Sequence, residues 1–280
     1  MLSRIESHAT RIGHLLGRRA TFGGQSFRMP GYYASRLPNA DGAHEAYMVA
    51  VLRRRLESSP GVFVDIGVNI GQTLAKVLGI DRNRAYLGFE PQISCCYNVD
   101  QFLRLNELHN ANVLPIALSD CNRMLTFYSQ GEFDEMAGLI AASEGPAGVR
   151  RAHFVPARIG DEVLRELGVG DICAIKIDVE GAELPVMRGL RETLRARRPS
   201  VIFEVLPNFH GRAERVMHPP SECARNQASA DAIYGLLDGI GYDIFQIDDH
   251  GGETRIERFE LNDRVAYVGN NYIAHSRGRP

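Results

Sequence analysis

From about residue 60 onward, short apolar runs alternate with segments whose apolar residues recur every three or four positions. The short runs are rich in Val, Ile and Phe and predict β-strands, and the longer-period segments predict helices. Such alternation is typical of a mostly parallel sheet with helices on both faces. The predicted strands are 61–67, 84–90, 112–118, 171–178, 200–206, 242–247 and 265–274, the last two as a hairpin-like pair.

Two of the predicted helices follow strands closely. Leu74, Val77 and Leu78 share one helical face, and Val186, Leu190 and Leu194 recur at four-residue spacing. Further helices are expected after 84–90, over 161–167, and around Ile233 to Ile240. Met124 to Tyr128 predicts a short extra strand. The stretches 130–157 and 207–227 are predicted to be irregular, and loops of that length usually have a function.

No internal repeat and no interdomain linker interrupts this pattern. We therefore expect one domain over 59–280, preceded by an N-terminal helical extension over 1–58. In the first 24 residues, arginines alternate with isoleucines and leucines. This predicts an amphipathic helix packed on the domain, with a transit peptide or a membrane-surface helix as alternatives.

Composition restricts the class of partner. A chain of 280 residues with a formal net charge of −2 has no general attraction to nucleic acid or anionic membranes. No apolar run is long enough to span a bilayer. The five cysteines include no C-x-x-C pair, so neither a zinc site nor a disulfide framework is expected, and the predicted setting is reducing and cytoplasmic. Arginines between 188 and 198 are interpreted as a solvated helix face.

The segment from Val64 to Gly71 is the most informative. It ends a predicted strand, contains glycines at 67 and 71, and begins a helix. Glycine lets the backbone approach a ligand closely, and the helix N-terminus offers unpaired N–H groups. Glu90 ends the next strand, where a carboxylate can accept hydrogen bonds from both hydroxyls of a ribose.

Two ligand classes use this geometry. A dinucleotide requires G-x-G-x-x-G, but Asn69 and Gln72 occupy the second and third glycine positions. S-adenosylmethionine has no pyrophosphate and carries an amino-acid moiety, which Asp65 and the turn can address. The sequence therefore favours S-adenosylmethionine over the two alternatives, a nucleotide-dependent oxidoreductase and a non-catalytic binding module.

The motifs, in order, resemble those of FkbM-type methyltransferases over roughly residues 45–275. They are Asp65-x-Gly67-x-Asn69-x-Gly71, Phe89-Glu90-Pro91, Ala117-Leu118-Ser119-Asp120 and Ile177-Asp178-Val179-Glu180-Gly181-Ala182-Glu183. One departure is Val68, where the family commonly has alanine. The resemblance implies a Rossmann-like class I methyltransferase fold with a seven-stranded sheet. It places Asp65, Gly67, Asn69, Gly71 and Glu90 at the cofactor, with Ser119 and Asp120 on the adenine side. It also implies an acceptor hydroxyl on a sugar, glycan or polyketide-type compound.

Methyl transfer to a hydroxyl needs an aimed acceptor and a nearby base. Asp178 and Glu180 follow the central strand and are predicted catalytic residues, with His210 as a competing base. His218 is a weaker candidate. Alternatively, Asp178, Glu180 and Glu183 hold a divalent cation with Glu204, or they favour the N-terminus of the next helix. No metal site is predicted, and Glu183 is interpreted as a first-turn carboxylate.

Overall fold

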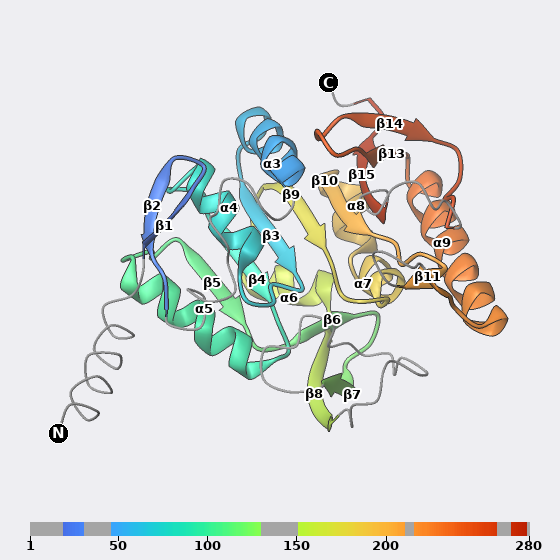
Figure 1. Ribbon diagram of the computed structural model, residues 1–280, viewed down its shortest axis with the longest axis horizontal. Helices are drawn as coiled ribbons and strands as arrows, with labels where there is room; N and C mark the ends of the chain where they lie inside the picture. The colour runs from blue at the N-terminus through green and yellow to red at the C-terminus, as the bar shows by residue number, and fades with distance from the viewer. Residues whose placement is uncertain (1–18, 31–45, 130–150, 211–215, 262–269, 279–280) are drawn as a thin grey trace.

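The computed structural model describes residues 19–30, 46–129, 151–210, 216–261 and 270–278. Its main sheet has eight strands in the order β14-β13-β15-β10-β9-β3-β4-β5 (Figure 1). The five strands from β10 to β5 run parallel, whereas β15 is antiparallel to both β10 and β13. In chain order the strands are β3 (Val62–Ile66), β4 (Tyr86–Phe89), β5 (Ala111–Leu114), β9 (Ile172–Ile177), β10 (Ser200–Glu204), β13 (Tyr242–Ile247), β14 (Glu253–Ile256) and β15 (Asn271–Ser276).

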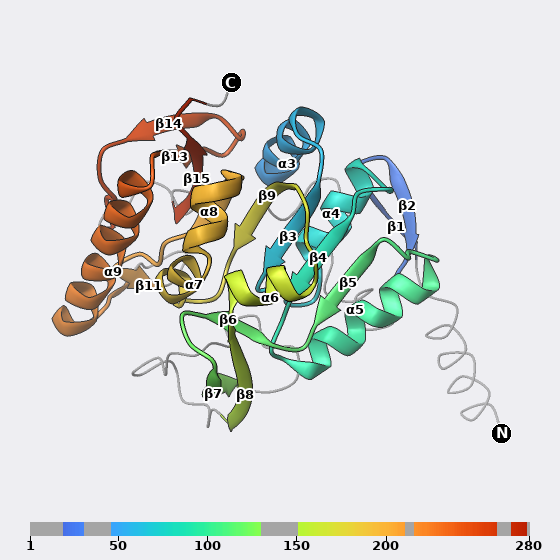
Figure 2. The same cartoon turned by 180° about the vertical axis from the view of Figure 1, so that it is seen from behind.

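Helices cover both faces of this sheet, and each face has its own hydrophobic core cluster (Figures 1 and 2). Helices α3 (Ala46–Ser58), α4 (Gln72–Ile80) and α5 (Ile93–Leu105) pack on one face. The other face carries α6 (Gly160–Glu166), α7 (Glu183–Gly189), α8 (Arg191–Arg197) and α9 (Pro220–Gly239). Leu74, Val77 and Leu78 of α4 are fully buried, as their spacing predicts. The predicted class I methyltransferase fold is confirmed, with β14 as an additional edge strand.

A second, three-stranded sheet lies beyond the carboxyl ends of the parallel strands (Figure 1). Its order is β6 (Ala117–Ser119), β8 (Arg151–Ile159) and β7 (Arg123–Ser129). The extra strand predicted over 124–128 is thus confirmed as β7. The strand predicted over 112–118 is divided into β5 and β6, which belong to different sheets.

Two predictions were wrong in detail. Residues 151–157 form most of β8 instead of an irregular segment, whereas 130–150 lie outside the described residues. This strand was missed because it contains Pro156. Proline cannot donate a hydrogen bond to a neighbouring strand, so its presence argues against a central strand. The polar stretch 207–227 contains β11 (Phe209–His210), β12 (Val216–Met217) and the first turns of α9. Pro220 begins that helix, as a proline at the first helical position can.

The described part of the N-terminal extension is only partly helical. Residues 19–28 form a hairpin of β1 (Arg19–Phe22) and β2 (Gln25–Arg28), and residues 1–18 lie outside the described residues. The hairpin packs closely on α4, since a Cβ on Gly79 would lie 2.3 Å from the backbone oxygen of Phe22. Helix α3 shares the core cluster of β3 and α4. Within the described ranges, no helix is long and apolar enough to cross a membrane.

Candidate active site

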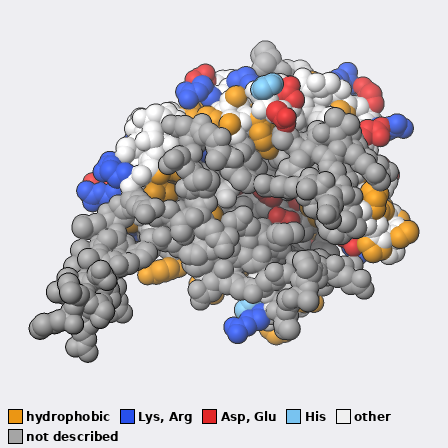
Figure 3. All heavy atoms as spheres, in the orientation of Figure 1, with side chains coloured by type: hydrophobic (Ala, Val, Ile, Leu, Met, Phe, Trp, Pro, Cys, Tyr) orange, Lys and Arg blue, Asp and Glu red, His pale blue; other side chains and the backbone are white. Residues whose placement is uncertain are grey.

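The carboxyl ends of β3, β4, β9 and β10 meet at one edge of the main sheet (Figure 1). Acidic side chains are visible near the centre of this face of the molecule, where β3 and β9 end (Figure 3). Ligands of open α/β sheets bind at the carboxyl ends of the strands. The residues that follow these four strands therefore define the candidate site.

The turn between β3 and α4 depends on its glycines. Gly67 has φ 89°, and a Cβ there would lie 1.7 Å from the backbone oxygen of Asp178. Gly71 also has φ 89° and is the N-cap of α4, with no side chain capping the helix. Asn69 adopts the left-handed conformation at φ 50°. The turn is thus pressed against the end of β9, and the N–H groups at the start of α4 have no side-chain cap.

Asp65 lies beneath this turn and is fully buried. Its Oδ2 accepts a hydrogen bond from the hydroxyl of Tyr86, and its Oδ1 has no hydrogen-bond partner among the described residues. Burial raises the pKa of Asp65 to about 6, against the opposing charge of Lys176. Asp65 does not cap α4. It is a buried carboxyl group with one unsatisfied oxygen, which is costly without a partner.

Glu90 follows β4 and is tied to the turn. Its Oε2 accepts the backbone N–H of Asn69 at 2.7 Å, and its Oε1 accepts that of Gln92 at 2.8 Å. Burial raises the pKa of Glu90 to about 7, although both hydrogen bonds favour the ionised form. Three of the predicted cofactor residues, Gly67, Asn69 and Gly71, therefore lie in one turn. Asp65 lies beneath this turn, and Glu90 is bonded to it.

Asp178 continues β9 beside this turn. Its backbone N–H donates to the oxygen of Ile66 at 2.9 Å, and its Oδ2 accepts from the ammonium of Lys176 at 2.7 Å. The side chain of Asp178 is 32% exposed and that of Lys176 only 7%. One carboxylate oxygen is thus fixed from below, while the side chain reaches the surface.

The loop after Asp178 carries further carboxyl groups. Glu180 adopts φ 53°. Glu183 is buried in the first turn of α7, and its Oε1 accepts from the backbone N–H of Gly181 at 3.1 Å and of Val179 at 3.3 Å. Burial raises the pKa of Glu183 to about 7. The position of Glu183 agrees with its interpretation as a first-turn carboxylate, and it also holds the loop.

Glu204, at the end of β10, completes the acidic cluster. Its pKa is raised well above the usual range by burial, and the charges of Asp178, Glu180 and Glu183 raise it further. The charges of these carboxyl groups therefore interact across the strand ends. Over the described part of the chain, no three His, Cys, Asp or Glu side chains are grouped closely enough to hold a metal ion.

The remaining predicted site residues lie outside the main sheet. Ser119 is buried at the end of β6, and its Oγ donates to Oδ1 of the exposed Asp120 at 3.4 Å. His210 lies in the two-residue strand β11, paired with β12, and its side chain is outside what the structure describes. Nδ1 of His218 lies 3.1 Å from Oε1 of Glu222, which is in the first turn of α9.

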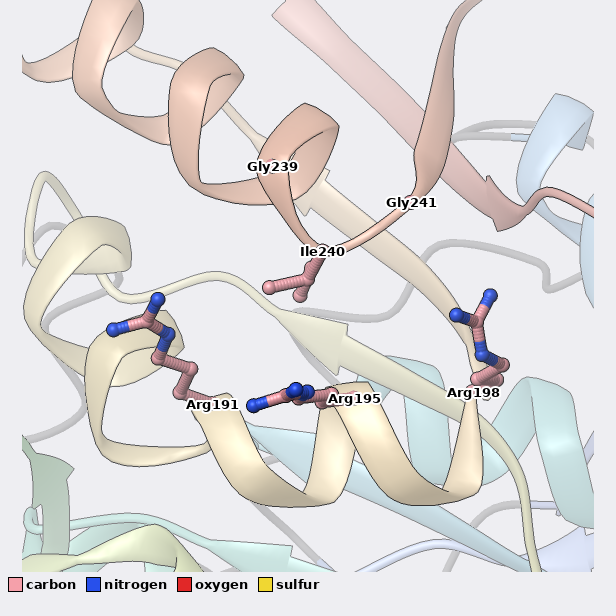
Figure 4. A pocket seen from close by; sticks show the side chains of 6 residues that line it. All are labelled: Arg191, Arg195, Arg198, Gly239, Ile240 and Gly241. Atoms are coloured by element: carbon pink, nitrogen blue, oxygen red, sulfur yellow. The ribbon is translucent and has the colours of Figure 1, made fainter.

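Two cavities lined by described residues lie away from this edge. One of about 910 Å³ lies at the amino ends of β3, β4 and β5. The other, about 470 Å³, is lined by Arg191, Arg195, Arg198 and the turn 239–241 (Figure 4). Figure 4 shows Arg191 and Arg195 on α8 and Arg198 just past its end. Arg195 and Arg198 lie at the carboxyl end of α8, which favours cations.

Two residues of the site were not predicted from the sequence. Tyr86 binds Asp65 across neighbouring strands, and its partner depends on the register Asp65↔Gly88, which no local pattern gives. Lys176 had a visible signal, because it is the one charged residue inside the otherwise apolar run 172–177. A cation in a buried central strand requires a nearby anion.

The family model for the methyltransferase FkbM domain matches residues 65–244, which contain this turn and all the clustered carboxyl groups. The chain belongs to the FkbM methyltransferase family. Its family and fold are those of S-adenosylmethionine-dependent methyltransferases. Among curated proteins, no sequence relative matches the chain.

Several solved structures are similar to this chain at low sequence identity. Methyltransferase FkbM from Methylobacillus flagellatus is 16% identical with a TM-score of 0.45; the match covers 77% of this chain and 43% of that protein. A Staphylococcus aureus protein assigned as a caffeoyl-CoA O-methyltransferase is 11% identical over 88% of each chain, with a TM-score of 0.48. Cofactor-bound Rv0187 from MTB is 12% identical over 88% of this chain and 86% of that one, with a TM-score of 0.46. This FkbM methyltransferase thus spans less than half of its Methylobacillus relative.

Proposed function

We propose that this chain transfers a methyl group from S-adenosylmethionine to a hydroxyl group of a sugar, glycan or polyketide-type acceptor. The cofactor supplies an electrophilic methyl group on a sulfonium. The observation that carries the proposal is the meeting of the glycine turn, Glu90 and Asp178 at one sheet edge. The first two suit the cofactor, and the third suits the acceptor.

The chain's own residues fit this cofactor. The unsatisfied Oδ1 and negative charge of Asp65 suit an ammonium group. The close approach at Gly67 and the uncapped start of α4 leave backbone N–H groups for a carboxylate. Glu90 offers lone pairs to ribose hydroxyls. Ser119 and Asp120, at the end of β6, are proposed to contact the adenine.

Asp178 is proposed to receive the acceptor. Lys176 holds its Oδ2, and among the described residues Oδ1 accepts no hydrogen bond. A carboxylate fixed by one oxygen can orient a hydroxyl with the other and accept its proton as the oxygen is methylated. Glu180 adds negative charge to the same loop. His210 remains the alternative base, in the segment after β10 that we propose borders the acceptor together with 130–157.

Calorimetry tests the proposal before any acceptor is known. S-adenosylhomocysteine should bind at one site, with NAD as the matched control for a nucleotide lacking the amino-acid moiety. Binding of NAD in place of S-adenosylhomocysteine would instead support an oxidoreductase. Binding of S-adenosylhomocysteine without transfer to any hydroxyl, amine or carbon acceptor would support a non-catalytic binding module.

A further inference from the structure

Lysine is confined to two positions in this chain. Of the 32 basic residues, only Lys76 and Lys176 are lysines, and each is only 6% exposed. The other basic residues, all arginines, include many that are exposed on the surface. A buried ammonium is costly unless carboxylates compensate it. Both lysines act on the pKa of the same group, Asp65, where their charges oppose the effect of burial.

Lys176 lies between carboxyl groups of three strand ends. In the parallel sheet its direct neighbours are Asp65 on β3 and Ile202 on β10. Side chains directly opposite one another point to the same face, and so do side chains two residues apart on a strand. Asp178 and Glu204 lie two positions beyond Lys176 and Ile202. The ammonium of Lys176 is therefore on the face shared by Asp65, Asp178 and Glu204.

The printed contact and the charges agree with this placement. The ammonium of Lys176 donates to Oδ2 of Asp178 at 2.7 Å. Its charge opposes the rise in pKa of both Asp65 and Glu204, and on Asp65 it acts more strongly than Lys76. The other groups that face this cluster are Tyr86 from β4, Glu90 beyond it, and Glu180 and Glu183 from the loop and helix after β9.

We propose that Lys176 is a positioning residue of the methyl-transfer site, which fixes Asp178 through Oδ2 and supplies the positive charge that Asp65 and Glu204 share. The inference rests on the proposed function, because that function gives Asp65 the cofactor's ammonium group and Asp178 the acceptor's hydroxyl. One buried cation then serves the cofactor side and the acceptor side together. Lysine suits this place because its ammonium is a compact point charge, whereas the guanidinium of arginine is a planar fork.

The test is the pH dependence of S-adenosylhomocysteine binding, measured by calorimetry between about pH 5 and 8. Wild-type affinity should fall in a step near pH 6, when Asp65 takes up a proton, separate from any change near pH 7 due to Glu90. In Lys176→Met the midpoint of this fall should rise by about 1 to 2 pH units, the effect expected of losing a nearby opposite charge. The midpoint measured for Lys176→Arg should stay closer to that of the wild type. Lys76→Met is the matched control and should shift the midpoint less.

A double-mutant cycle separates charge from packing. In Asp65→Asn the fall near pH 6 should be absent, and adding Lys176→Met should not create one. If Lys176→Met does not fold, Lys176→Gln takes its place. A midpoint in Lys176→Met equal to that of wild type overturns this inference and leaves the proposed function intact. Failure of the wild type to bind S-adenosylhomocysteine at any pH overturns both.

Discussion

The carboxylate of Glu90 accepts the backbone N–H of Asn69 at 2.7 Å, which joins the end of β4 to the turn that follows β3. The two residues are therefore one unit: Asn69 keeps its left-handed conformation while Glu90 holds its amide. A ligand that lies against the turn must also lie against Glu90. This explains how two motifs that are 21 residues apart in sequence address a single cofactor.

Replacing Glu90 by alanine should weaken S-adenosylhomocysteine binding by about 1.5–3 kcal/mol, because the ribose hydroxyls lose a charged acceptor. Glu90→Gln, which keeps an acceptor oxygen, should lose less of this binding free energy. Calorimetry measures both, and Glu57→Ala, which removes an exposed carboxylate on α3, is the control. Wild-type affinity in a folded Glu90→Ala protein would remove Glu90 from the cofactor site.

Gly67→Ala should destabilise the protein by more than about 2 kcal/mol, because its φ of 89° is unfavourable for a side chain and the new Cβ meets the backbone of Asp178. Gly170→Ala is the matched control, since nothing lies within 4 Å of a Cβ there. Urea denaturation measures both free energies of unfolding. Equal stability of the two variants would show that the turn and β9 are not in close contact.

The protein without ligand should melt at a higher temperature near pH 5 than near pH 8. Burial raises the pKa of Asp65 to about 6 and those of Glu90 and Glu183 to about 7. In the unfolded chain these groups titrate near pH 4, so between about pH 4 and 7 the folded state binds more protons. Their contribution to stability is therefore present at low pH and is lost as the pH rises through this window.

Glu253 should make the protein less stable at acid pH. Burial alone raises its pKa, but hydrogen bonds from His275 and Arg54 lower it to about 2. Its stabilising contribution is present above the unfolded value near pH 4 and is lost below it. Differential scanning calorimetry should therefore find maximal stability near pH 4, where the two trends meet. A melting temperature that rises steadily from pH 5 to 8 would contradict the burial of the three site carboxyls.

Asp178→Asn should lower turnover by about 10²- to 10⁴-fold while changing cofactor affinity little, because it keeps the size of the side chain and removes the negative charge. His210→Ala, assayed alongside, tests the competing base. If the carboxylate instead anchors a cation, a chelator should inactivate the wild type. Near-wild-type turnover in Asp178→Asn would leave His210 or positioning alone to account for catalysis.

Patterns within short stretches of sequence predicted several elements of this fold correctly. The apolar run of β9 and the four-residue spacing in α4 are visible in any short window, and the glycine turn has its own motif. Strand β8 was missed because Pro156 and its arginines conceal an alternation in which Val155 and Ala157 are buried. The start of α9 was missed because most residues of its first turns are polar.

The candidate site was predictable where one motif holds several residues and was missed where neighbours come from different strands. Asp65, Gly67, Asn69 and Gly71 lie together because they are adjacent in sequence. Tyr86 and Lys176 join them only through the register of β3 with β4 and β9. Register is set by the packing of the whole sheet, so a single sequence does not reveal which side chains meet across it.

The central claim is methyl transfer to a hydroxyl, and a labelled-cofactor screen tests it most directly. S-adenosylmethionine with a deuterated methyl group is incubated with panels of sugar, glycan and macrolide alcohols, and products are analysed by mass spectrometry and NMR. We predict a product whose labelled methyl carbon is bonded to oxygen, formed by the wild type and strongly reduced with Asp178→Asn. A labelled methyl group on nitrogen or carbon would contradict the account.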